Sequence, residues 1–171
     1  MAGFVSILED LLLSFRLPVF TRKADRALVS HPKFYFFDAG VFRSVRPIGP
    51  LDNPSEINGA ALEGLVAQHL RAWGALRRKR TDLFYWRTRA GNEVDFVVYG
   101  ADVFAAIEVK NTDKVRSTDL SGLNAFLEEY PESTAILLYR GSKRLKKNKV
   151  LYMPVEEFLL GLKPNTELKE I

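Results

Sequence analysis

The sequence predicts an α/β fold in which helices cover a mixed β-sheet. The first observation is the order of its patterned segments, which run helix, three strands, helix, strand between residues 54 and 139. The second is composition, because 47% of the 171 residues are hydrophobic, enough to fill the core of one domain. The third is that no apolar run approaches the ~18 residues that a membrane span needs, so no transmembrane segment is expected.

The first 52 residues are expected to form an extension that packs on this core. An apolar stretch at 3–15 predicts a short helix, which Pro18 prevents from continuing. Residues 21–33 form a basic connector, and the four aromatic residues at 34–37 predict a strand. Asp38, two residues before a glycine, is typical of a turn or a helix cap.

The main domain is predicted over residues 53–171. It begins with a helix, because Asn53 is a favourable cap, Pro54 suits the first helical position, and apolar residues recur at helical spacing up to Gly74. Turn residues and alternating hydrophobicity predict the other elements in chain order: strands at 83–89, 94–99 and 103–110, a helix at 117–130, a strand at 134–139, a basic loop at 143–149, a strand at 150–153 and a helix at 155–162.

Composition excludes several classes of site. The chain has no cysteine, which rules out disulfides, thiolate metal sites and cysteine nucleophiles. Its two histidines are too few for a histidine-rich metal site. The 25 Lys and Arg against 21 Asp and Glu give a net charge of +4, which permits contact with nucleic acid without requiring it. Without cysteine or a secretory signal, the protein is expected to be cytoplasmic.

The informative residues are charged side chains on strands that are otherwise apolar. The third predicted core strand is apolar up to Glu108, and two-residue periodicity places Glu108 and Lys110 on one face. Asp95 is likewise a lone carboxylate among apolar neighbours. If the two strands form an antiparallel hairpin with Tyr99 opposite Phe104, Asp95 lies directly opposite Glu108. Two facing carboxylates repel unless a cation lies between them, and a divalent metal is the natural candidate.

Glu63 supplies a third acid. It lies at the edge of the apolar stripe of the first core helix, so packing that helix on the sheet aims Glu63 toward Asp95 and Glu108. An oxygen-rich ligand set without cysteine suits Mg²⁺ or Mn²⁺. A metal held by two acids beside Lys110 can hydrolyse a phosphodiester, because the metal lowers the pKa of water and neutralises charge on the phosphate. For each residue alone, a solvated strand face or a surface ion pair is the alternative interpretation.

The order and spacing of these residues resemble the PD-(D/E)XK nuclease superfamily, whose core is helix, three strands, helix, strand. More narrowly, the chain resembles the C-terminal domain of unknown function found in many prokaryotic AAA+-type ATPases. The phrases that carry this second resemblance are HPKFYFFDAG at 31–40, FYWRT at 84–88, EVDFV at 93–97, IEVK at 107–110 and LLYRG at 137–141.

The resemblance implies a restriction-endonuclease-like core with a short N-terminal extension, and a role for each acid. Asp95 and Glu108 would ligate Mg²⁺ or Mn²⁺, and Lys110 would be the catalytic lysine. Glu63 would be the helix acid that binds metal through water or assists a second ion. It also implies DNA as substrate and an AAA+-type ATPase domain as partner in a longer protein. No ATP site is expected in this chain, because it lacks the G-x-x-x-x-G-K-S/T loop that such an ATPase needs.

Basic residues flanking the predicted strands are candidates for contacting a phosphate backbone. They are the run Arg77, Arg78, Lys79 and Arg80, together with Arg87 and Arg89. A solvated loop tuned for solubility is an equally good interpretation of the run. Three functions stay open at this point: a metal-dependent nuclease, a nuclease-like module that binds DNA or a protein without cleaving, and a structural or regulatory domain with a vestigial acid cluster.

Overall fold

The computed structural model describes residues 2–21, 31–46, 49–164, 166–168 and 171. Most of the predicted basic connector, at 22–30, lies outside the described residues. Among the described helices, none combines the length and the apolar character required to cross a bilayer.

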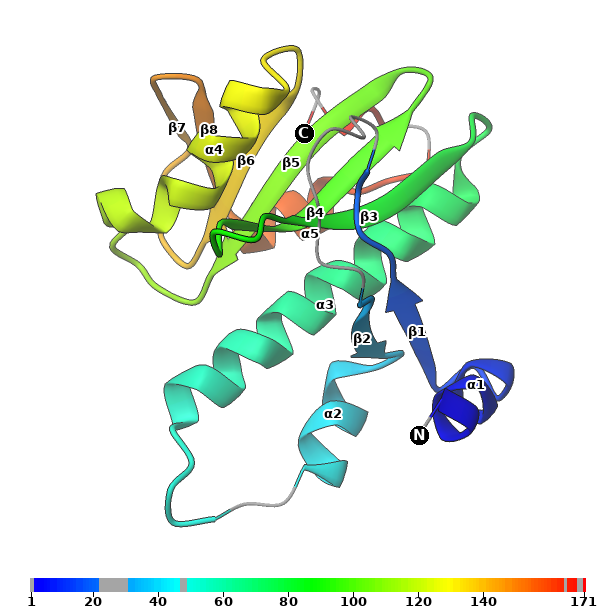
Figure 1. Ribbon diagram of the computed structural model, residues 1–171. Helices are drawn as coiled ribbons and strands as arrows, with labels where there is room; N and C mark the ends of the chain where they lie inside the picture. The colour runs from blue at the N-terminus through cyan, green and yellow to red at the C-terminus, as the bar shows by residue number, and fades with distance from the viewer. Residues whose placement is uncertain (1, 22–30, 47–48, 165, 169–170) are drawn as a thin grey trace.

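The centre of the molecule is a six-stranded mixed sheet with the strand order β3-β4-β5-β6-β8-β7 (Figure 1). The strands are β3 (Thr81–Arg87), β4 (Glu93–Gly100), β5 (Val103–Lys110), β6 (Thr134–Tyr139), β7 (Leu145–Lys147) and β8 (Val150–Pro154). Strands β3, β4 and β5 pair antiparallel, β5, β6 and β8 pair parallel, and β7 returns antiparallel to β8. The predicted α/β class with a mixed sheet is therefore confirmed.

Helices cover both faces of the sheet (Figure 1). Helix α3 (Pro54–Leu76) and helix α5 (Val155–Gly161) bury apolar side chains against one face. Helix α4 (Ser121–Glu129), entered through a 3₁₀ turn (Ser117–Leu120), packs on the other face through Leu123 and Phe126. The α3 start agrees with the sequence prediction, because the Asn53 side chain accepts a hydrogen bond from the Ser55 backbone N–H at 2.9 Å.

The N-terminal residues form a separate two-stranded antiparallel sheet of β1 (Ser14–Leu17) and β2 (Lys33–Phe36). Their inward side chains Phe15, Leu17 and Tyr35 are buried in the core beneath α3. Helix α1 (Ala2–Asp10) precedes β1 and lies beyond the end of β1 that points away from the main sheet (Figure 1).

The predicted helix at 3–15 is too long, because the chain leaves the helix after Asp10. Leu12 adopts a left-handed conformation with φ of 59°, and the N–H groups of Leu12 and Leu13 bond back to the carbonyls of Glu9 and Leu8. This is the Schellman arrangement that ends many helices, here with leucine where glycine is usual. The reversal frees the following residues to pair as β1.

Two further elements were not predicted. Asp38 proves to be a helix cap, because its Oδ1 accepts from the N–H groups of Gly40 and Val41 at the start of α2 (Ala39–Val45). Within the predicted basic loop at 143–149, three residues form the edge strand β7 instead. Lysines on an exposed edge discourage pairing with other chains, which explains a basic strand at that position.

Candidate active site

Four carboxylates and two ammonium groups gather where β4 begins and β5 ends. They are Glu63 of α3, Glu93 and Asp95 of β4, Glu108 and Lys110 of β5, and Lys33 of β2. These six residues are called the acid cluster below. It contains all four of the catalytic residues expected from the sequence, and adds Lys33 and Glu93.

The hairpin register expected from the sequence is confirmed, since Tyr99 pairs with Phe104 and the ladder continues to Phe96 opposite Ile107. The ladder ends one pair before Asp95 and Glu108 would meet. Instead, Asp95 Oδ2 accepts a hydrogen bond from the Val109 backbone N–H at 2.9 Å. The Asp95 carboxylate thus takes the place of the backbone carbonyl that would otherwise accept from the Val109 N–H. This hydrogen bond fixes the Asp95 side chain beside Glu108.

Asp95 and Glu108 are buried, with only 8% and 7% of their surfaces exposed. Burial raises the pKa of Asp95 well above its usual range, and the charges of Glu108 and Glu63 raise it further, against the opposing effects of Lys33 and the Val109 N–H. Burial also raises the pKa of Glu108, although Lys110 opposes this. A buried carboxylate pair of this kind is stabilised by a proton or by a cation.

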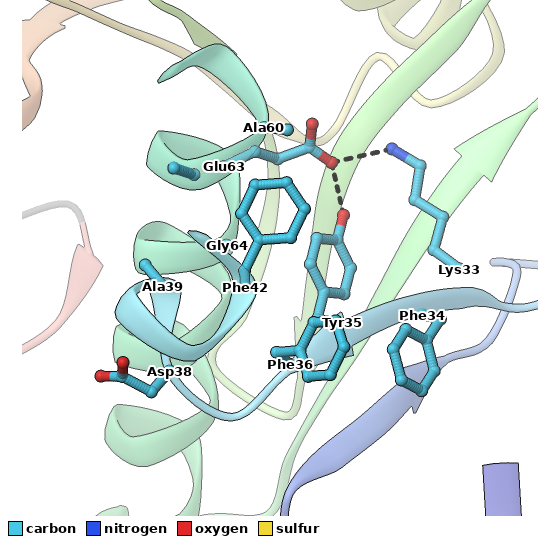
Figure 2. Close-up of a pocket in the computed structure, with 11 residues that line it drawn as sticks. Lys33, Phe34, Tyr35, Phe36, Asp38, Ala39, Phe42, Ala60, Glu63 and Gly64 are labelled. Carbon is cyan, nitrogen blue, oxygen red and sulfur yellow. Dashed lines mark hydrogen bonds and ion pairs between the residues drawn. The ribbon is translucent and has the colours of Figure 1, made fainter. Parts of the chain in front are cut away.

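Lys33 provides one cation. Its Nζ lies 3.1 Å from Glu63, 2.5 Å from Glu93 and 3.3 Å from Asp95, and Figure 2 shows it directed at Glu63 across the end of the Tyr35 ring. Burial disfavours the Lys33 charge, but the carboxylates outweigh it and raise the pKa of Lys33. Lys33 therefore stays protonated and neutralises part of the cluster.

Tyr35 fixes the helix acid in place. Its hydroxyl donates a hydrogen bond to Glu63 Oε1 at 2.5 Å (Figure 2). Burial, followed by the Glu63 charge, raises the pKa of Tyr35, so the phenol remains a donor. The sequence prediction that Glu63 points toward Asp95 agrees with this geometry, because Lys33 joins the two carboxylates.

Lys110 provides the second cation and lies beside Glu108, with 2.6 Å between Nζ and Oε1. Burial lowers the pKa of Lys110, but the adjacent Glu108 charge more than compensates, and the net shift is upward. Lys110 therefore stays an ammonium group. It can donate hydrogen bonds and stabilise negative charge, but it cannot take a proton from a nucleophile.

The side chains of the acid cluster offer oxygen atoms as ligands for a divalent metal. In the described part of the chain, no three or more His, Cys, Asp and Glu side chains form a group that could hold a metal ion. However, Glu108 Oε2 is buried and has no hydrogen-bond partner among the described residues. Asp95 and Glu108 thus offer carboxylate oxygens, the ligands that Mg²⁺ and Mn²⁺ prefer.

The basic run expected to contact DNA does not lie near the acid cluster. Thr81, which follows the run, pairs with Gly100, whereas Arg87 at the other end of β3 pairs with Glu93. Seven residues of strand, at ~3.3 Å each, separate the two ends by about 20 Å. The run therefore flanks the opposite end of the sheet from the acids.

The members of the run also differ in their surroundings. Arg77 is almost fully buried, because it stacks on Trp73 at 4.4 Å and forms two hydrogen bonds with Asp102 at 2.6 and 2.7 Å. Lys79 also pairs with Asp102, whereas Arg80 reaches only Asp82, at 3.4 Å. The Arg77 guanidinium is thus already engaged within the fold, by Trp73 and Asp102.

Two predicted basic residues do lie at the acid end of β3. Arg87 Nε is 3.4 Å from Glu93 Oε2, and half of the Arg87 side chain is exposed. Arg89 is exposed in the following turn, as Arg78 is exposed at the far end. A residue that sequence reasoning did not single out, Arg140, is also exposed here, bonded through Nε to Asn111 just beyond Lys110.

The family model described as Domain of unknown function (DUF4143) matches residues 58–158, which is more than half of the chain. The chain belongs to this family. No curated protein and no solved structure is similar enough to count as a match. The DUF4143 match spans Glu63, Asp95, Glu108 and Lys110, but it begins after β2. Lys33 and Tyr35 therefore reach the acid cluster from outside the matched residues.

Proposed function

We propose that this DUF4143 protein is a metal-dependent nuclease-like domain that hydrolyses DNA phosphodiesters. The observation that carries the proposal is the buried pair Asp95 and Glu108, with Lys110 held at 2.6 Å and Glu108 Oε2 lacking a hydrogen-bond partner among the described residues. The succession α3, β3, β4, β5, α4, β6 supports the finer assignment of a PD-(D/E)XK, restriction-endonuclease-like core.

Each residue has a defined task in this proposal. Asp95 and Glu108 would hold Mg²⁺ or Mn²⁺, which when bound lowers the pKa of water and neutralises phosphate charge. Lys110, oriented by Glu108, would donate to a phosphate oxygen and stabilise the negative charge that develops while the water oxygen bonds to phosphorus and the P–O bond to the leaving group breaks. The proton that the water loses passes to solvent, and the departing oxygen takes up a proton from solvent. Glu63, held by Tyr35, orients water at the edge of the site.

A second candidate is a nuclease-like module that binds DNA or a protein partner without cleaving, or that regulates an ATPase. One observation favours it: Lys33 already contacts three of the acids and compensates one of their negative charges. For both candidates we propose that the chain is the C-terminal part of a cytoplasmic, ATPase-linked protein. This rests on the domain family and on the sequence features described above, including the absence of cysteine.

The test is cleavage of labelled linear and branched DNA with Mg²⁺ or Mn²⁺. We expect the wild type to cut, Glu108→Ala to abolish cutting, and the control Glu156→Ala, at an exposed glutamate of α5, to leave it unchanged. Cutting equal in all three proteins would contradict the assigned site. DNA binding by the wild type without any metal-dependent cutting would favour the non-catalytic module.

A further inference from the structure

Beside the acid cluster lies a cavity of about 270 Å³, between α3 on one side and β2 and α2 on the other (Figure 2). We infer that this cavity binds one unpaired nucleobase of the DNA strand; the inference rests on the proposed function. The residues used in the argument are Phe34, Phe36 and Phe42 on one side and Ala60, Ala61 and Gly64 on the other. This cavity is called the aromatic slot below.

The walls of the aromatic slot suit a flat ring. Apart from Glu63, the α3 residues that line the slot are small, and a Cβ added to Gly64 would meet no atom within 4 Å. On the other side, the Phe34 and Phe36 rings lie 5.2 Å apart at 85°, and Phe36 lies 6.5 Å from Phe42. Stacking on such aromatic side chains is the usual way in which proteins hold single bases.

The size of the slot limits its occupant. Drug-sized ligands occupy pockets of about 300–1,000 Å³. The slot is slightly smaller than this range, which suits a single base better than a base pair. A base in a duplex could enter only by leaving its stack, which costs least where it is already unpaired. The slot therefore selects single-stranded, mismatched or branched DNA.

One end of the slot is polar and belongs also to the acid cluster. Glu63 and Lys33 line the slot, and the same two side chains are bonded to each other at 3.1 Å. The Glu63 carboxylate keeps lone pairs that can accept a hydrogen bond from the edge of a base, and Lys33 places a positive charge beside it. Because Glu63 is shared, a strand whose base occupies the slot runs next to the acid cluster.

Binding is measured separately from cleavage, in EDTA, with a single-stranded oligothymidylate that carries one central 2-aminopurine. Stacking quenches the fluorescence of this base, so we expect saturable quenching by the wild type. Gly64→Leu, which fills the slot, is expected to weaken binding at least about fivefold, the lower limit for loss of one stacked base. Ala72→Leu adds the same side chain on an exposed part of α3 and should leave binding unchanged.

A second variant keeps the test decisive if Gly64→Leu fails to fold. Phe42→Leu retains an apolar wall but removes a ring, and should also weaken quenching and affinity. A competitor of the same length and charge, with abasic residues in place of all its bases, should compete at least about fivefold less well than the base-containing strand. Equal competition by the two strands, or unchanged binding by both variants, would overturn the inference.

The test also separates this inference from the proposed function. If the wild type binds the base but does not cut DNA, the proposed nuclease function is wrong and the assignment of the slot stands. If it cuts DNA with metal and the slot variants have no effect, the assignment of the slot is wrong and the nuclease function stands. If N-acetylphenylalanine amide binds in the slot and the fluorescence of 2-aminopurine is not quenched, the slot holds a protein side chain. That result would overturn the inference.

Discussion

Replacing Lys33 by methionine tests the electrostatic description of the acid cluster most directly. The substitution keeps the apolar stem but removes the ammonium that contacts Glu63, Glu93 and Asp95 at 2.5–3.3 Å. Removing one partner of a buried ion pair costs about 3–5 kcal/mol. Since 23% of the Lys33 side chain is exposed, we expect a loss near the lower limit, about 3 kcal/mol. At this chain length that loss lowers the melting temperature by about 6–12 °C.

The loss should depend on pH in a defined direction. The pKa of Asp95 is already raised in the folded state, so its ionisation opposes folding as pH rises. Without Lys33 this pKa rises further. The variant is therefore expected to differ most from wild type above neutral pH and least as pH falls toward the usual carboxyl range near ~4. The pKa of Lys33 itself is raised, so wild type keeps this ion pair throughout that range.

Divalent metal should restore much of what Lys33→Met loses. If the acids can bind Mg²⁺ or Mn²⁺, removing the competing ammonium raises the affinity, and a bound ligand stabilises the fold by about 2.7 kcal/mol at a hundred times its dissociation constant. Thermal unfolding with and without the metal, over a pH series, measures both effects. Arg16→Met, which breaks the exposed pair with Glu9, is the control for the metal and should not respond to it. Because Arg16 lowers the pKa of Glu9, the deficit of this variant should shrink only as pH falls through the carboxyl range. A Lys33→Met deficit that is independent of pH and insensitive to metal would refute the reasoning.

Three other substitutions test the packing of the fold, and the stability of each variant is measured by urea denaturation. Gly122→Ala should cost about 3 kcal/mol or more, because its Cβ would lie 1.8 Å from the Glu93 carbonyl oxygen and must push α4 off β4; a neutral result would contradict that close approach. Leu12→Gly should gain about 1 kcal/mol, because it relieves the positive φ at an exposed position; a loss would mean that the leucine side chain contributes contacts. Arg77→Met should lower the free energy of unfolding by about 2–3 kcal/mol, because it removes the buried hydrogen bonds to Asp102. Its affinity for DNA should stay unchanged. Weaker DNA binding without a loss of stability would show that Arg77 contacts phosphate.

The core of the fold could be predicted because its signals are local. The limits of β5 and β6 agree with the sequence prediction, since each apolar run ends at turn residues or charges. The expected hairpin, with Tyr99 opposite Phe104, gave the β4–β5 register and so placed Asp95 next to Glu108. The α1–β1 boundary has no such signal, because leucine at position 12 occupies a conformation that usually calls for glycine.

The role of Lys33 could not be predicted, because it depends on contacts between distant parts of the chain. Lys33 is 30 residues from Glu63 and 62 from Asp95, and in the sequence it closes a basic connector. Only the placement of β2 beside α3 reveals its partners. The reverse holds for Arg77, whose basic neighbours suggested a surface patch while its packing on Trp73 buries it.

The segment just before the basic connector has a consequence for how this family is trimmed in the laboratory. The backbone of Pro18 and Phe20 bonds to Tyr85 along the outer side of β3, and the Phe20 ring is buried among Phe84, Tyr99 and Phe126. A fragment that begins at residue 58, where the family match starts, would lack these residues. The backbone amide and carbonyl groups of β3 would then be unpaired, next to the apolar surface that Phe20 covers. An exposed strand edge of this kind pairs with other chains and promotes aggregation. Precipitation of the short fragment would then reflect the position of the cut, and the natural unit for expression begins upstream of β1.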